Sequence, residues 1–98
     1  MEKLKGQYET VFIVNPELGE EKVQELVAKF REMIEKNATV ENVDEWGKRK
    51  LAYPIDDIQD GYYMVMQFTA DRDFPVELER VFHITEGILR SITVRLDA

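Results

Sequence analysis

Alternation of apolar and polar side chains predicts extended segments along much of the chain. In residues 8–14 one face carries Tyr8, Thr10, Phe12 and Val14. The opposite face carries Glu9, Val11 and Ile13, so both faces are largely apolar and predict a central strand covered on each side. The same period of two recurs in residues 39–43, 48–53, 62–70 and 88–96.

Two segments follow the period of a helix instead. A helix of about 18 residues is predicted from apolar spacings of three and four, with the stripe Val23, Leu26, Val27, Phe30, Met33 and Ile34. Asn37 is expected to stop it in a left-handed conformation. A second helix begins at Asp73-Phe74-Pro75 and buries Leu78, Val81 and Phe82, with Gly87 as its stop.

Two short segments interrupt the strands. Residues 45–47 break the alternation between residues 39–43 and 48–53, which indicates a turn or a β-bulge. Residues 56–61, with three aspartates and a glycine, are typical of a turn. Pro54 closes its strand or places it at a sheet edge.

The predicted order is strand, helix, strand, strand, helix, strand. This βαββαβ order indicates an α+β, ferredoxin-like fold, with a four-stranded antiparallel sheet and both helices on one face. The other face is then uncovered and would carry Val11, Ile13, Tyr63 and Val65. A contiguous apolar patch of this kind marks a surface for a partner.

Composition narrows the function classes. The 98 residues suit a single domain, residues 1–98. The absence of cysteine excludes a disulfide scaffold and thiolate metal sites, and a single histidine, His83, excludes a histidine metal cluster within one chain. We expect no metal site, no membrane span and no secretory signal. The chain is therefore expected to be a cytoplasmic protein that binds rather than catalyses.

The charge of the chain is unevenly distributed. The formal net charge is −7, but residues 46–55 carry Lys48, Arg49 and Lys50 and no acid. Trp46 and Tyr53 flank these cations, which we call the basic island. Lysine and arginine meet phosphates, and aromatic rings stack on bases or pack against a partner. From this chemistry alone, a merely solvated surface is the favoured interpretation, and a binding surface stays open.

The residues 45–55, Glu-Trp-Gly-Lys-Arg-Lys-Leu-Ala-Tyr-Pro-Ile, resemble the signature of the bacterial small-subunit ribosomal protein six family. The start at Tyr8-Glu9, the Asn15-Pro16 ending and residues 88–91 are similar to the same family. The resemblance implies a non-enzymatic constituent of the small (30S) subunit, with no cofactor and no small-molecule substrate. It implies binding to 16S ribosomal RNA in the central (platform) domain alongside small-subunit ribosomal protein eighteen, a small basic protein.

The resemblance also suggests which residues bind. The RNA-facing candidates are Lys3, Lys5, Tyr8, Lys48, Arg49, Lys50 and Arg90. The partner-facing candidates are Trp46, Tyr53, Tyr63 and Val65.

Two other function classes share this fold. A regulatory module that binds a small molecule would need a defined pocket and a sheet face that pairs with its own copy. An acylphosphatase-like hydrolase would need an anion-binding loop, whereas residues 15–20 are acidic, which disfavours a phosphate site there.

Overall fold

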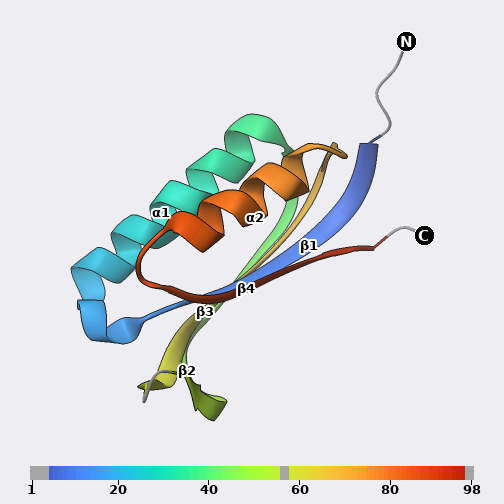
Figure 1. Ribbon diagram of the computed structural model, residues 1–98. Coiled ribbons are helices and arrows are strands. Elements are labelled where there is room, and N and C mark those ends of the chain that lie inside the picture. The colour runs from blue at the N-terminus through green and yellow to red at the C-terminus, as the bar shows by residue number, and fades with distance from the viewer. Residues whose placement is uncertain (1–4, 56–57, 97–98) are drawn as a thin grey trace.

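The computed structural model describes residues 5–55 and 58–96 and has the predicted architecture. Four strands form one antiparallel sheet in the order β2-β3-β1-β4, and helices α1 and α2 lie together against one face of it (Figure 1). The prediction of an α+β, ferredoxin-like βαββαβ fold is confirmed. β1 is a central strand, as predicted, and lies beside β3, but within the described residues helices cover only one of its two faces.

The elements have the following bounds: β1 Lys5–Val14, a 3-10 turn at Pro16–Leu18, α1 Glu20–Asn37, β2 Thr39–Ile55, β3 Ile58–Asp71, α2 Phe74–Ile84 and β4 Ile88–Arg95.

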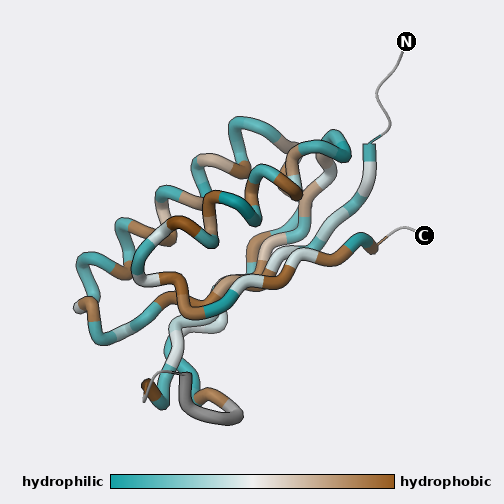
Figure 2. Tube along the Cα trace, viewed as in Figure 1, coloured by the Kyte–Doolittle hydropathy of each residue, from teal (hydrophilic) through white to brown (hydrophobic). Residues whose placement is uncertain are grey.

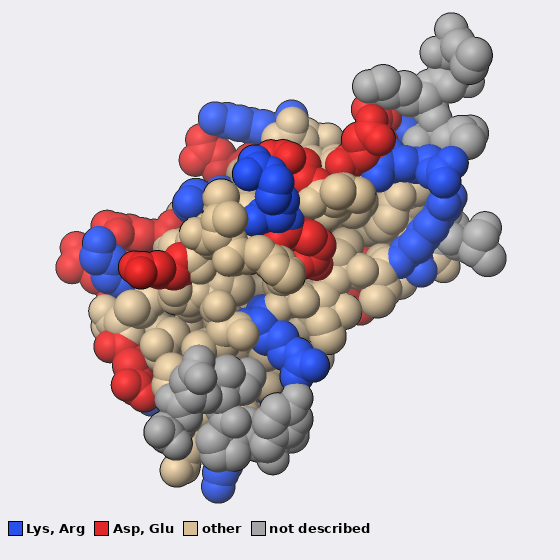
Figure 3. Space-filling model, viewed as in Figure 1, with Lys and Arg blue, Asp and Glu red and all other residues tan. Residues whose placement is uncertain are grey.

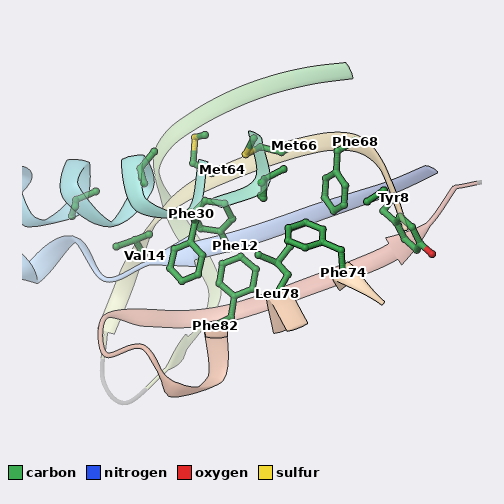
Figure 4. Close-up of a cluster of buried hydrophobic side chains, with 14 residues drawn as sticks. Tyr8, Phe12, Val14, Phe30, Met64, Met66, Phe68, Phe74, Leu78 and Phe82 are labelled. Carbon is green, nitrogen blue, oxygen red and sulfur yellow. The ribbon is translucent and has the colours of Figure 1, made fainter. Parts of the chain in front are cut away.

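Aromatic side chains fill the space between the helices and the sheet. Phe30 of α1 and Phe82 of α2 stack with ring centroids 4.3 Å apart, and Phe12 of β1 lies 5.0 Å from Phe82 (Figure 4). Apolar positions recur along both helices and along the strands (Figure 2). Burying such rings stabilises the fold by about 1.5–3 kcal/mol each, so this layer fixes how both helices sit on the sheet.

Hydrogen bonds join α2 to the edge strand β4. The carboxylate of Glu79 accepts from the Ser91 hydroxyl at 2.8 Å and from the Thr93 hydroxyl at 2.7 Å. Thr93 lies 2.9 Å from the hydroxyl of the buried Thr10 in β1. Ser91 and Thr93 therefore face the helices, and the alternating Ile92 and Val94 face the other side.

Three local predictions need correction or refinement. Residues 58–61 belong to β3 and not to a turn, because β2 and β3 pair out to Ile55 and Ile58. The interruption at residues 45–47 is a bulge inside one continuous strand, β2. Asn37 does end α1, but it does so by donating from Nδ2 to the Met33 carbonyl at 2.8 Å, followed by an extended Ala38.

The β2–β3 pair gives the molecule its long axis. The principal extents are 48 × 25 × 23 Å. The far part of the pair, residues 47–51 with 58–62, projects past the helices in Figure 1, and we call it the distal end. It holds the basic island, from which β2 continues to Ile55.

A candidate nucleic-acid and protein interface

The sheet face turned away from the helices has an apolar centre. In one row across it, Tyr63, Ile13 and Arg90 are register partners. In the next row Asp44, Val65, Val11 and Ile92 are aligned. Within the described part of the chain, no helix covers these rows, and Ile92 keeps 50% of its surface exposed. The predicted open-face residues Val11, Ile13, Tyr63 and Val65 do share this face.

A stack of three planar groups lies beside these rows. The Trp46 ring is stacked on the Tyr63 ring, with centroids 6.0 Å apart and planes 22° apart. The Arg49 guanidinium carbon lies 5.3 Å from the centre of the Trp46 ring, within the range of a cation–π contact. Arg49 Nε also donates to the Trp46 carbonyl at 3.4 Å, and Trp46 Nε1 donates to Asp44 Oδ2 at 2.9 Å. Trp46 is still 43% exposed, so the stack presents an aromatic surface to solvent.

The bulge in β2 places Trp46 in this position. The β2–β3 register shifts between Glu45 and Gly47, so Trp46 is the extra residue on the bulged strand. Gly47 has φ 78°, a left-handed conformation that side chains other than glycine rarely adopt. Trp46 thus supplies the aromatic ring, and the left-handed backbone of Gly47 allows the bulge that places this ring on the open face.

A small apolar cluster supports the stack from within the sheet. Ile13, Leu51 and Val65 are buried on the open face without joining the main core. Ile13 and Leu51 both lie over Gly61, since a Cβ there would clash with Ile13 Cγ2 and lie 3.1 Å from Leu51 Cδ2. The sequence pattern did not place Leu51 or Gly61 in the site: Leu51 belongs to the predicted extended segment 48–53 and Gly61 to the predicted turn at residues 56–61.

The basic island is divided between the two faces of the sheet. Lys48 is opposite Tyr62, whose hydroxyl accepts from Gln24 of α1 at 3.3 Å, so both lie on the helical side. Lys48 also lines a hollow of about 430 Å³ beside Val23 and Gln24 of α1. Lys50, opposite Asp60, alternates onto the same side, whereas Arg49, opposite Gly61, lies on the open face with Trp46 and Tyr63.

The remaining RNA candidates are scattered. Lys5 is the first residue of β1 and pairs with Asp71 of β3. Lys48 pairs with Tyr62, nine residues away along β3, so the two lysines are separated by about 30 Å along the sheet. Arg90 lies on the open face in the row of Tyr63. Tyr8 is only 7% exposed and stacks on Phe68 at 5.9 Å, inside the core.

Two predicted contacts cannot be placed in this geometry. Lys3 lies outside the described residues. Tyr53 is described as a residue of β2, but its side chain lies outside the description.

Charges over the helices are paired locally. Acidic and basic side chains are interspersed on the face shown in Figure 3. A hydrogen bond from Lys36 lowers the pKa of Glu32, and one from Arg80 lowers the pKa of Glu77. These pairs offset part of the positive charge carried by the helices.

Metal binding and membrane insertion can be considered for residues 5–55 and 58–96. No three acidic or histidine side chains gather there in a geometry that would hold a metal ion. Among the helices of that same part, none is long and apolar enough to cross a membrane.

Comparison with known proteins gives a consistent result. The sequence model of a family described as Ribosomal protein S6 matches residues 7–95. The chain is 53% identical to small ribosomal subunit protein bS6 of Clostridium novyi over 88 residues, which are 89% of this chain and 93% of the relative. It is 51% identical to the bS6 protein of Clostridium beijerinckii over 89 residues, covering 90% and 94% of the two chains.

Solved structures agree with these sequence relatives. The crystal structure of 30S ribosomal protein S6 from Thermotoga maritima superposes with a TM-score of 0.86 at 33% identity, covering 94% of this chain and 88% of that one. An uncharacterised protein of the same organism has a TM-score of 0.65 at 17% identity, covering 96% and 100% of the two chains, which shows a shared fold only.

Proposed function

The chain belongs to the ribosomal protein S6 family, and from this premise we propose that it binds 16S ribosomal RNA jointly with small-subunit ribosomal protein eighteen. Membership makes it a structural protein of the small ribosomal subunit, in the cytoplasmic ribosome of a bacterium. The family is non-enzymatic, which removes the hydrolase considered from the sequence. The RNA contact in the central domain and the protein partner are the proposal.

The proposal rests on one observation: β2 has two chemically different surfaces on its two sides. The lysines of the distal end lie on one side of the strand, and the aromatic stack lies on the other. A polyanion and a protein can therefore approach the same strand from opposite sides without competing.

On the RNA side, Lys48 and Lys50 are the proposed phosphate contacts. Both are exposed, and they alternate onto the same side of a strand that projects from the body of the protein. Lysine acts on phosphate as a point charge and displaces condensed counterions, so binding should weaken as salt is added. Lys3, Lys5 and Arg90 extend the set of candidates, whereas the buried ring of Tyr8 has no surface to offer the RNA.

On the protein side, we propose the open sheet face around Trp46, Tyr63 and Val65, with Tyr53 from the same strand. Aromatic side chains over an apolar floor are typical of the energetically dominant part of a protein interface. A basic partner also suits a chain with a net charge of −7.

The test is a gel shift on a central-domain fragment of 16S ribosomal RNA. It compares this protein alone, protein eighteen alone and both together, over a range of salt concentrations. We expect a shift that needs both proteins and fades with salt, because each ligand raises the affinity for the other. Replacing Lys48, Arg49 and Lys50 together with alanine should weaken the shift while circular dichroism stays unchanged.

A gel shift that fails with both proteins present would contradict the proposal. If no mixture containing this protein shifts the fragment, joint RNA binding is wrong, and the regulatory module with a self-pairing sheet face becomes the better hypothesis. Sedimentation of the free protein would then be expected to show a tight homodimer.

A further inference from the structure

We propose that Arg49 belongs to the protein-docking surface and acts by positioning Trp46, whereas Lys48 and Lys50 alone supply the phosphate contacts of the basic island. This inference rests on the function proposed above. It assigns three consecutive cations to two different partners, which composition and charge do not reveal.

Strand alternation is the first ground. Arg49 is opposite Gly61, and a Cβ at Gly61 would point into Ile13 of the open face. Lys48 is opposite Tyr62, which is hydrogen-bonded to α1 on the helical side. A strand cannot present both neighbours to the same surface, because successive side chains leave it in opposite directions.

The contacts of Arg49 are the second ground. Its guanidinium carbon lies 5.3 Å from the centre of the Trp46 ring, and its Nε donates a hydrogen bond to the Trp46 carbonyl at 3.4 Å. The indole of Trp46 is also stacked on Tyr63, and its Nε1 donates to Asp44. Three neighbours, Arg49, Tyr63 and Asp44, therefore set the orientation of the ring. Arg49 therefore completes the aromatic surface, and a flexible ammonium group in its place would not stack in the same way.

The surroundings favour a protein over RNA as the occupant. The stack adjoins the apolar residues Val65 and Ile92, and acidic side chains lie on the same face at Asp44 and Glu9. Carboxylates also lie near the lysines, at Asp60, Glu17 and Glu20, so the open face is distinguished by its apolar floor and not by its acids. This floor suits a basic protein segment whose apolar side chain rests on the Trp46–Tyr63 stack. The occupant to which we commit is such a segment of the basic protein partner.

Two measurements on the same variants test the assignment. Calorimetry measures the affinity for protein eighteen without RNA, and filter binding with saturating partner measures the salt dependence of RNA affinity. We expect R49A to weaken partner binding roughly tenfold, the effect typical of a central interface residue, and to leave the salt slope unchanged. We expect K48A/K50A to leave partner affinity within about twofold and to reduce the salt slope by about 1.5, as for two lost phosphate contacts.

Two further variants separate stacking from charge. R49K keeps the charge and loses the planar group, so it should resemble R49A if Arg49 acts by positioning the indole. R72A removes one exposed cation from the turn before α2 and should match the wild type in both measurements. Thermal unfolding of every variant checks that the fold is retained.

The outcomes that contradict the inference differ from those that contradict the function. If R49A lowers the salt slope by about 1 and leaves partner affinity unchanged, Arg49 contacts phosphate and the assignment is overturned. If R49K restores wild-type partner binding, charge and not stacking is responsible, and the positioning role is wrong. If the wild type binds RNA but shows no binding to protein eighteen in calorimetry, the docking surface is wrong, and if it binds neither, the proposed function itself fails.

Discussion

At the scale of single residues, Gly61 shows how a missing side chain shapes the site. It lies under the contact between Ile13 and Leu51, directly opposite Arg49. The space that a β-carbon would need is already filled by these two side chains. The open face is therefore closely packed beneath the aromatic stack, even though no helix of the described chain covers it.

Gly61→Ala is expected to destabilise the protein by roughly 1–3 kcal/mol, the usual cost of an overpacked site. The added carbon would clash with Ile13 Cγ2, so one strand must shift. Urea unfolding monitored by circular dichroism measures the change. In an Ile13→Ala background the same substitution should cost clearly less, because the clashing atom is gone. Equal costs in the two backgrounds would show that packing against Ile13 is not the cause.

At the scale of elements, the hydrophobic period predicted the helices and strands well. Both helix stripes and the two faces of β1 are as expected, because each is a local consequence of a repeat of 3.6 or two residues. The end of β2 and start of β3 were not predicted, since aspartates and a glycine at residues 56–61 are turn formers and only cross-strand pairing overrides that preference.

The candidate site was predictable in part. The division of the basic island follows from alternation within residues 48–53, which the sequence already indicated to be extended. The stacking of Trp46 on Tyr63 was not predictable, because it depends on a one-residue bulge whose position sets which face the indole takes. Tyr8 was proposed as an RNA contact because of its place at the strand start, but packing on Phe68 buries its ring.

Glu79 is expected to matter for the attachment of α2 to β4. Glu79→Ala removes the acceptor of both the Ser91 and Thr93 hydroxyls, so we expect a loss of about 1–3 kcal/mol in unfolding free energy. Faster amide hydrogen exchange in β4 would accompany the loss. The matched change Glu77→Ala, two residues earlier in α2, breaks the exposed pair with Arg80 and should have little effect. Equal effects of the two substitutions would contradict the proposed role of the Glu79 hydrogen bonds.

At the scale of the whole molecule, one strand, β2, carries both proposed binding surfaces. The helices anchor the sheet on one side and leave the other side open, while the long β2–β3 pair carries the cations past the body of the protein. The acidic remainder of the chain discourages contact with RNA elsewhere. Binding to the two proposed partners is thereby concentrated on the same bulged segment of β2.

If both partners bind the bulged segment of β2, the bulge should influence both binding reactions. Gly47→Ala introduces a side chain at φ 78° where no atom lies within 4 Å, so its effect is on the backbone alone. We expect weaker binding of protein eighteen and of the RNA fragment, whereas Tyr63→Ala weakens only the first and Lys48→Ala only the second. Both affinities are measured separately, by calorimetry for the protein and by filter binding with saturating partner for the RNA. Val27→Ala, which trims a buried side chain of α1, controls for lost stability and should leave both affinities unchanged. If Gly47→Ala affected only one of the two reactions, the bulge would not be the element that joins the two surfaces.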